Sequence, residues 1–343
     1  MATDNLSIGF ARACLVWRTG GAKMWNLIAD VGGTNMRLAA VNAEGEILEQ
    51  ARYDSKGTQN LEEACADFAA HRGSAPGRAV IAAAGVVRGG SVQLTNANQS
   101  FSERGIAVAL QTERVKVLND FEAAAWSLAS VSAGDVTVLQ GQAVFPKEPC
   151  LIIGPGTGLG VGALIWANGE PCVVPGEGGH VAIGPRTADE VAIFEALREE
   201  WPEIGMGPGL AVEAEGILSG TGLPYFYRAV ARSMELTAPL TTGAEIFQSA
   251  QARLDTAAVR AVSLFAQYLA GVAGDLGLVF AAKGGVFVTG GVAAANPWIF
   301  DAAFVEAFNA GGRHTAWREE LPLHLYHQPN FGLIGARNYL RAR

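Results

Sequence analysis

The feature that most constrains the fold is a pair of glycine-rich turns, each lying between two apolar, strand-like runs. They occur in "WNLIADVGGTNMRLAAV" and "LIIGPGTGLGVGALIW", and a shift of 123 positions places Gly33-Thr34 on Gly156-Thr157. Glycine lets an anion approach backbone N–H groups closely. The two turns, together with "TGG" at 289–291, therefore predict that phosphates are held between two lobes.

The second turn does not match the commoner nucleotide-binding motifs. It lacks the Gly-Lys-Ser/Thr of a P-loop, and no frame contains G-x-G-x-x-G, although Gly158, Gly160 and Ala163 give its alanine variant. A dinucleotide fingerprint also opens a helix, whereas "VGALIW" continues as a strand. We therefore interpret this turn as a hairpin tip. The first turn, taken alone, is equally compatible with an ordinary tight turn that exposes Asp30.

Length and charge limit the class of protein. A chain of 343 residues, half of them hydrophobic and 17% charged, is expected to be globular with two lobes. Its net charge of −8 argues against nucleic acid or an anionic membrane as the main partner. The most apolar stretch, 261–282, is interrupted by Gln267 and Asp275, so it predicts a buried core helix rather than a membrane span.

The four cysteines lie far apart and form no Cys-x-x-Cys pair. This usage predicts free thiols in a reducing cytoplasm rather than a zinc or disulfide framework. Residues 1–23 contain no sustained apolar segment, because Arg12 and Arg18 interrupt it, and so do not predict a signal peptide. We assign this leader no function.

Strand-like and helix-like segments mix in the α/β manner. Beyond the two turns, strands are expected at 78–85, 91–96 and 115–118 and in "GGVFVTGG" and "LPLHLYH". Helices are expected at 58–71, at 102–111, from Asp120 onward, through much of 188–282, and at 297–309 and 331–342. A boundary near 131–135 predicts a small α/β domain of 24–130 plus 328–343 and a large one of 131–327.

The stretch "VKVLNDFEAAAW", residues 115–126, changes abruptly from strand-like to helix-forming at Asn119-Asp120. Asp120 could simply cap the helix, because Asp is a preferred N-cap. It could also face a cleft and accept the proton of a weakly nucleophilic hydroxyl. The two roles can coexist, and we expect the helix N-terminus to lower the pKa of this carboxyl group and keep it ionised.

The loop "PGEGGH" contains a carboxylate and an imidazole, Glu177 and His180. Both are metal-ligand types, but the glycines at 176, 178 and 179 favour a loop that closes tightly over a small polar ligand. Two such groups can recognise neighbouring hydroxyls by directional hydrogen bonds, which discriminates strongly between substrates. Solvent-exposed loop residues are the alternative interpretation.

Seven motifs occur together in one order: "ADVGGTNMRLA", "LTNANQSFS", "VLNDFEAAA", "GPGTGLGVG", "PGEGGHVAIGP", "EGILSGTGL" and "GGVFVTGGV". From about Trp25 to its end, the chain resembles the bacterial glucokinases, ATP-dependent hexose kinases of the actin-like ATPase superfamily. The resemblance implies a two-lobed actin-like (ribonuclease H-like) α/β fold with a cleft between a small and a larger domain. It also implies Mg-ATP-dependent phosphorylation of glucose at its 6-hydroxyl to glucose 6-phosphate, at the entry to glycolysis, by a homodimer.

The resemblance also implies a role for each site residue. Asp120 matches the catalytic base. The sugar-binding positions are Asn96, Asn119, Asp120, Glu177, His180 and Glu215. The triphosphate positions are Asp30, Gly32, Gly33, Thr34, Asn35, Gly156, Thr157 and Gly158, and the adenosine positions are Gly290 and Gly291. Asp30 is also expected to hold Mg²⁺ through water, since hard cations prefer carboxylate oxygens.

The sequence departs from related patterns in three places. "NQSF" lacks the aromatic residue usual beside Asn96, which weakens the case for that contact. "GHVAIGPRTADEVAIFEAL" lacks the cysteines of the zinc motif found in the sister group of repressor and open-reading-frame sugar kinases, so no structural metal site is expected. Neither turn contains an obvious arginine or lysine, so we expect N–H groups and metal to stabilise the transferred charge.

Three alternatives stay open. The enzyme could phosphorylate another hexose or an amino sugar, which kinetics with several sugars would decide. A sugar-sensing repressor would need a helix-turn-helix domain before Trp25, for which 24 residues are too few. An actin-like filament or chaperone ATPase would hydrolyse ATP without sugar and would leave "PGEGGH" unexplained.

Overall fold

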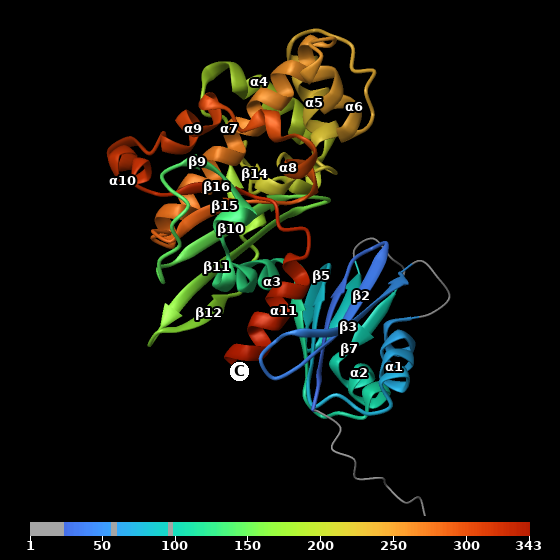
Figure 1. Cartoon of the computed structure of the whole chain (residues 1–343). Coiled ribbons are helices and arrows are strands. Elements are labelled where there is room, and N and C mark those ends of the chain that lie inside the picture. Colours follow the sequence, from blue (N-terminus) through green and yellow to red (C-terminus); the bar gives the residue numbers. More distant parts are fainter. Residues whose placement is uncertain (1–23, 56–59, 95–98) are drawn as a thin grey trace, which may run out of the picture.

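The computed structural model describes residues 24–55, 60–94 and 99–343. It contains two large sheets (Figure 1), and the five strands of the first are ordered like five of the six strands of the second. The first has the order β3-β2-β1-β4-β8, with β1 Asn26–Val31, β2 Asn35–Val41, β3 Ile47–Asp54, β4 Ala79–Ala83 and β8 Val115–Asn119. The second has the order β12-β11-β10-β15-β16-β9, with β9 Val136–Gln140, β10 Cys150–Pro155, β11 Leu159–Ala167, β12 Glu170–Val174, β15 Gly285–Val288 and β16 Leu323–Tyr326.

The pairing directions repeat as well. Each sheet begins with an antiparallel hairpin, β1–β2 or β10–β11, and a third antiparallel strand continues it on one side. Two parallel strands follow on the other side, β4 and β8 or β15 and β16. The repeat predicted from the two glycine turns is therefore confirmed at the level of topology, and both turns are hairpin tips.

The first sheet buries its two faces against different partners, because alternate side chains of a strand point to opposite sides. Helices α1 (Leu61–Arg72) and α2 (Glu103–Leu110) cover one face, on which Leu27 and Ala29 pack with Phe68. A small sheet of β5 (Gly85–Arg88), β6 (Ser91–Leu94) and β7 (Ser100–Ser102) lies beside it. Helix α1 begins later than expected because Asn60 caps it through a capping box.

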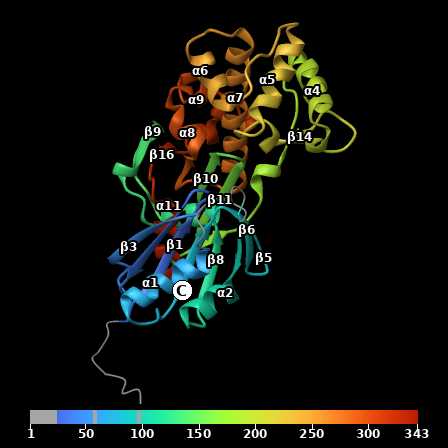
Figure 2. The same ribbon diagram turned by 90° about the vertical axis from the view of Figure 1, so that its right-hand side faces the viewer.

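Two helices lie between the sheets (Figure 1), and Figure 2 shows one of them, α11, from the side. Helix α11 (Phe331–Ala342) packs on β1 and β4, whereas α3 (Asp120–Ser127) packs mainly on β10, β11 and β12. One hydrophobic cluster joins the inner faces of both sheets through these helices, from Ile28 to Leu333 and Phe287. The expectation that 331–342 is a helix is confirmed at both ends.

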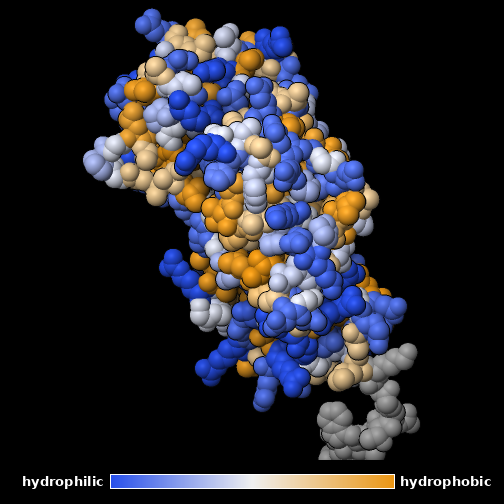
Figure 3. All heavy atoms as spheres, turned by 90° about the vertical axis from the view of Figure 1, so that its left-hand side faces the viewer, coloured by the Kyte–Doolittle hydropathy of each residue, from blue (hydrophilic) through white to orange (hydrophobic). Residues whose placement is uncertain are grey.

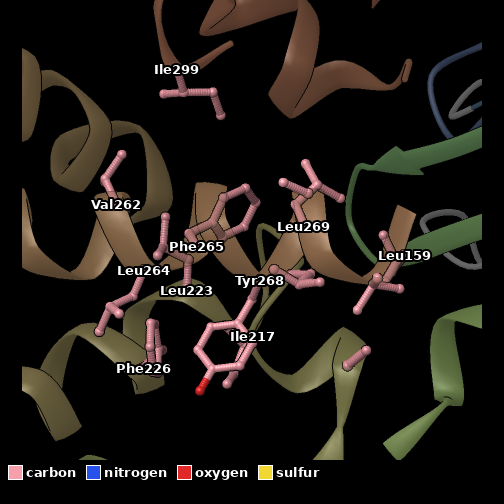
Figure 4. Packing of buried hydrophobic residues seen from close by; sticks show 14 of the residues in the cluster. Leu159, Ile217, Leu223, Phe226, Val262, Leu264, Phe265, Tyr268, Leu269 and Ile299 are labelled. Carbon is pink, nitrogen blue, oxygen red and sulfur yellow. The ribbon is translucent and has the colours of Figure 1, made fainter. Parts of the chain in front are cut away.

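The largest core lies on the far side of the second sheet. It is built around α7 (Thr256–Val279), whose Phe265, Tyr268 and Leu269 are buried there (Figure 4). The helix is long and apolar enough to cross a membrane by composition alone, but it packs in the centre of this cluster, as the sequence predicted. The other helices here are α4 Ala188–Glu200, α5 Leu223–Ser233, α6 Gly243–Gln251, α8 Gly291–Ala295, α9 Ala302–Asn309 and α10 Thr315–Glu319.

Two crossing segments connect the sheets, 128–136 on the way out and 327–330 on the way back. Asp135 ties them together: its backbone carbonyl accepts from His327 N–H at 2.9 Å, and its carboxylate accepts from Gln328 Nε2 at 2.9 Å. Seen from the left of Figure 1, hydrophobic side chains gather near the middle of the surface, and hydrophilic ones dominate towards its ends (Figure 3).

Candidate functional site

A cavity of about 470 Å³ lies between the carboxyl end of the first sheet and the tip of the second hairpin. This volume is typical of small-molecule sites. Predicted residues from distant parts of the chain line it together: Asn119, Asp120, Gly156, Thr157, Gly158, Glu177, His180 and Glu215. The structure therefore brings together most of the predicted sugar positions and one of the two predicted phosphate turns.

Asn119, rather than Asp120, caps helix α3. Its side-chain oxygen accepts from Phe121 N–H at 2.9 Å and from Glu122 N–H at 3.4 Å, and its amide nitrogen donates to Gly85 O at 3.0 Å. Asp120 is the first residue of the helix, and its carboxylate also accepts from Phe121 N–H at 2.9 Å. The capping role considered for Asp120 thus falls mainly to its neighbour.

The expected lowering of the Asp120 pKa is wrong. Burial at the cavity wall raises the pKa of this carboxyl group to about 6, and the nearby carboxylate of Asp30 raises it further. The hydrogen bond from Phe121 N–H opposes this shift without cancelling it. Removal from water therefore outweighs the helix terminus. A carboxylate with a pKa near the working pH is well suited to accept a proton.

Asp30 lies opposite Arg37 in the β1–β2 ladder. Their charged groups are 3.8 Å apart, and Arg37 Nη1 also donates to Asn330 Oδ1 at 2.8 Å, just before helix α11. Burial raises the pKa of Asp30, and the Arg37 guanidinium opposes that rise. Arg37 was not predicted from the sequence, because it lies in strand β2 and outside both glycine turns.

The donors near Asp30 fit a Mg²⁺ ion that keeps most of its water. The charge of the Asp30 carboxylate raises the pKa of Asp120, and both carboxylates are hard oxygen donors. The described residues contain no cluster of three or more His, Cys, Asp or Glu side chains that could hold a metal by themselves. Mg²⁺ in phosphoryl-transfer sites is commonly bound by one or two carboxylates, water and substrate phosphates.

The tip of the second hairpin is held by the segment 219–222. Gly220 N–H donates to Gly156 O at 2.7 Å, and the hydroxyl of Thr221 donates to Thr157 O at 2.9 Å. The carboxylate of Glu215 accepts from Leu159 N–H at 2.7 Å. Glu215, singled out only by resemblance, thus joins the predicted sugar site to the predicted phosphate turn.

Several glycines of the second hairpin allow neighbouring residues to pack closely against its backbone. A Cβ atom at Gly160 would overlap the ring of Phe121, and one at Gly154 or Gly162 would also collide with this residue. A Cβ at Gly158 would meet the Glu215 carboxylate. Only glycine permits this close approach, which seats helix α3, and with it Asp120, directly on the hairpin. Gly156 has open space around it.

Two glycines of "PGEGGH", Gly178 and Gly179, likewise allow close packing. A Cβ at Gly178 would press on Val161 at 2.9 Å, and one at Gly179 would overlap Leu159 O. These two glycines let the loop pack closely against β11, and closure of the loop over a ligand stays a prediction. Glu177 and His180 remain exposed at the cavity.

A two-stranded ribbon, β13 (Ala182–Ile183) and β14 (Val212–Glu213), fixes this loop beside the Glu215 segment. It places Glu213 next to His180, whose Nδ1 lies 2.9 Å from Glu213 Oε2. This hydrogen bond raises the pKa of His180, and the carboxylates of Glu215 and Glu177 add to the effect against partial burial.

The remaining predicted residues lie outside the lining of this cavity. The first tip, 32–35, lies beyond Asp30, and Ser55 braces it: Ser55 N–H donates to Thr34 O at 3.0 Å. Gly290 packs on the second hairpin, where a Cβ would lie 2.5 Å from Pro155 O, and Gly291 begins α8. Asn96 falls outside the described residues.

The sequence reasoning also missed cavity residues. Ser219, Thr221 and Trp201 line the cavity, and Trp201 stacks on Tyr225 with their ring centres 4.6 Å apart. Ser219 and Thr221 belong to the motif "EGILSGTGL", so the sequence contained a signal for them. Trp201 and Glu213 gave no signal, because only the fold brings them to the site.

Comparison with known proteins gives a consistent result. The glucokinase family model matches residues 27–343. A glucokinase of Rhizobium meliloti strain 1021 is 38% identical over 318 residues, covering 92% of this chain and 91% of that protein. The crystal structure of a glucokinase from an Antarctic psychrotroph matches with a TM-score of 0.81 at 28% identity, covering 93% of this chain and 99% of that one.

A glucokinase from Balamuthia mandrillaris, crystallised with glucose, matches with a TM-score of 0.75 at 24% identity, covering 93% of each chain. At that identity the match supports the fold alone. Together with the two like-ordered sheets, these matches confirm the predicted two-lobed actin-like ATPase fold. The chain belongs to the glucokinase family.

Proposed function

We propose that the cavity is the place where this enzyme phosphorylates glucose, with Asp120 as the general base. One observation carries the proposal: a half-buried carboxylate with a pKa of about 6 shares a cavity with Glu177, His180 and the tip of a glycine hairpin. A proton acceptor, polar side chains suited to hydroxyls and the tip of a glycine hairpin thus line one cavity.

The proposed reaction proceeds in one displacement. An oxygen lone pair of the 6-hydroxyl of glucose forms a bond to the terminal phosphorus of ATP. The bond from that phosphorus to the bridging oxygen breaks, and its electron pair leaves with ADP. The hydroxyl proton passes to a carboxylate oxygen of Asp120. Because only the ionised carboxylate accepts it, turnover should decline as the pH falls below about 6.

The two hairpin tips are proposed to hold the triphosphate, with Gly290 and Gly291 behind the adenosine. Glu177, His180, Glu215, Asn119 and Asn96 are proposed to bind the sugar; Asn119 would do so while it keeps its cap, since one amide hydrogen of its side chain remains. Mg²⁺, held by Asp30 through water, would neutralise charge on the phosphates. The protein itself aligns the two substrates and excludes water.

We also propose that residues 24–130 with 328–343 close on residues 131–327 when the substrates bind. The two crossing segments, 128–136 and 327–330, support this division because they lie side by side, tied through Asp135. Closure would keep water from competing with the sugar as phosphoryl acceptor. We further infer, from the family resemblance, a homodimer located in the cytoplasm.

Replacing Asp120 with asparagine tests the base directly. Asp120→Asn should lower kcat by roughly 10²–10⁴-fold, because the amide cannot accept the proton, while glucose binding measured by calorimetry stays near that of the parent. Glu122→Gln is the matched control: Glu122 lies in the same helix, burial raises its pKa too, and it is not among the cavity-lining residues.

A coupled assay of ATP consumption with and without glucose provides the readout. If Asp120→Asn retained the kcat of the parent, the base assignment would be wrong. Rates with mannose, fructose and N-acetylglucosamine would show whether another sugar is the better substrate. Consumption of ATP without any sugar would instead favour a sugar-independent ATPase.

A further inference from the structure

His180 is held on one side by a carboxylate that the proposed reaction does not use. Its Nδ1 lies 2.9 Å from Oε2 of Glu213, and both side chains are partly exposed, at 46% and 36% of their surface. A hydrogen bond at this distance needs a proton on Nδ1, because the ionised carboxylate can only accept. The ring nitrogen on the opposite side, Nε2, is therefore the one left for the cavity.

The backbone fixes this pair. Strand β14 pairs with β13 so that Glu213 lies opposite Ala182, two residues after His180. The next residue, Ala214, donates its N–H to Val181 O at 2.9 Å, which ties the ribbon beside the imidazole. The register thus brings Glu213 to His180 and, two residues later, Glu215 to the hairpin tip.

We propose that Glu213 is a positioning residue, which holds the His180 ring through Nδ1 so that Nε2 donates a hydrogen bond to a hydroxyl oxygen of the sugar. This inference rests on the proposed function and adds to it which partner donates the hydrogen bond between His180 and the sugar. Glu177 and Glu215 can only accept hydrogen bonds when ionised, so they would accept from sugar hydroxyls. His180 would donate to a hydroxyl oxygen, and the site would therefore distinguish donating from accepting hydroxyls.

Donation by Nε2 requires either the charged imidazolium or the tautomer with its proton on Nε2. Because Nδ1 already donates its proton to Glu213, only the imidazolium can donate to Glu213 and to the sugar hydroxyl at the same time. The charged groups that raise the pKa of His180 are the carboxylates of Glu213, Glu215 and Glu177. As the pH rises through that raised pKa, the Nε2 proton is lost, and the KM for glucose should increase.

The experiment uses the full chain with Glu213→Gln, which keeps the size and a hydrogen-bond acceptor but removes the charge. The matched control is Glu49→Gln, which removes the charge from a comparably exposed 3.0 Å pair with Arg72, on β3 in the first sheet. Thermal melting establishes that both variants are folded. The His180 titration is followed by NMR of the ligand-free protein, with its signal assigned by comparison with His180→Gln.

Glu213→Gln should lower the pKa of His180 and move the rise in glucose KM to lower pH. At a pH between the two measured His180 pKa values, where the parent ring keeps its Nε2 proton and the variant ring has lost it, we expect the KM of the variant to be up to roughly tenfold higher, the size of one lost charge-assisted hydrogen bond. kcat at saturating glucose should change much less, because the contact orients the sugar rather than taking part in bond making. Glu49→Gln should leave both curves unchanged.

Two results would overturn the proposal. An unchanged His180 titration in Glu213→Gln would mean that the pair does not govern the ring. A changed titration with an unchanged KM profile would mean that the sugar is not read through His180. Neither result bears on the Asp120 test, which measures kcat, so failure of this inference and failure of the proposed function are separable.

Discussion

The two glycine hairpins have the same place in their sheets but are built differently. The first tip is closed by a hydrogen bond from Gly32 N–H to Asn35 O at 3.0 Å and is braced from within its own half by Ser55. The second is closed by a shorter turn, from Gly156 N–H to Gly158 O at 2.8 Å, and is braced by the loop 219–222.

The difference extends to the strands behind the tips. The second strand of the first hairpin buries side chains such as Met36 and Leu38. The corresponding strand of the second hairpin has glycines at 160 and 162, on which Phe121 of helix α3 rests. Equivalent topology therefore serves two purposes: the first hairpin carries a carboxylate, Asp30, and the second provides the seat of the helix that carries Asp120.

Gly160→Ala, in the second hairpin, should have the largest effect on stability and activity. The new Cβ would overlap the Phe121 ring, and because neither partner can move freely, we expect a loss of about 3 kcal/mol in unfolding free energy. kcat should also fall, since α3 and Asp120 would shift. Urea unfolding and steady-state kinetics measure the two effects. Gly156→Ala, which meets no close neighbour, is the control for stability.

A double variant sharpens the test. Phe121→Ala should make Gly160→Ala nearly neutral, because the ring that the Cβ would strike is absent, and the two changes should then be strongly non-additive. Additive losses would show that Gly160 is needed for another reason, such as its own backbone conformation.

The second sheet should also be the more acid-sensitive half. His324 is fully buried between Phe145 and Phe287 without a hydrogen-bond partner on either ring nitrogen among the described residues, and burial lowers its pKa to about 4. Below pH 6.5 His324 binds a proton in the unfolded chain, whereas in the folded protein it stays neutral down to about pH 4. Stability is therefore fully present above 6.5 and should fall by about 2 kcal/mol between pH 7 and 5.

Denaturant unfolding at several pH values measures this fall, and hydrogen exchange should show the second sheet losing protection before the first. His324→Leu should remove the acid-sensitive component. A fall of the same size in that variant would assign the acid sensitivity to other groups.

The smallest expected effect concerns the brace of the first tip. Ser55 is buried, and its hydroxyl donates to Gly32 O at 2.7 Å. Ser55→Ala should cost about 1 kcal/mol in unfolding free energy and raise the KM for ATP while glucose binding stays unchanged. Thr221→Ala, which removes the matching 2.9 Å bond at the second tip, serves for comparison. An altered glucose affinity in Ser55→Ala would show that the first tip is not confined to the nucleotide.

Much of the fold was accessible from the sequence because it depends on local pattern. The apolar runs on both sides of each glycine turn predicted the two hairpins, and the helical periodicity predicted α7 and α11. The expected helix at 297–309 is instead a short 3-10 turn followed by α9, because Asp301 starts a new helix by accepting from Phe304 N–H. That interruption depends on one capping bond, which periodicity does not reveal.

The site was accessible where the residues stand in recognisable motifs. The motifs predict Asp120, Glu177, His180 and Glu215 as site residues, and the structure brings these four to one cavity. Glu213 and Arg37 were missed, because an acidic or basic residue in a strand looks like any other until the neighbouring strand is in register.

Residue type and short-range order in the sequence were sufficient for the duplicated hairpins, the α/β class and the choice of candidate site residues. The burial, the neighbours and hence the pKa values of those residues depend on the tertiary structure. Burial, which depends on the whole fold, raised the pKa of Asp120 against the pull of its own helix terminus. Several glycines are required because a Cβ atom would collide with Phe121 or with Leu159 O, and these atoms are distant in the chain.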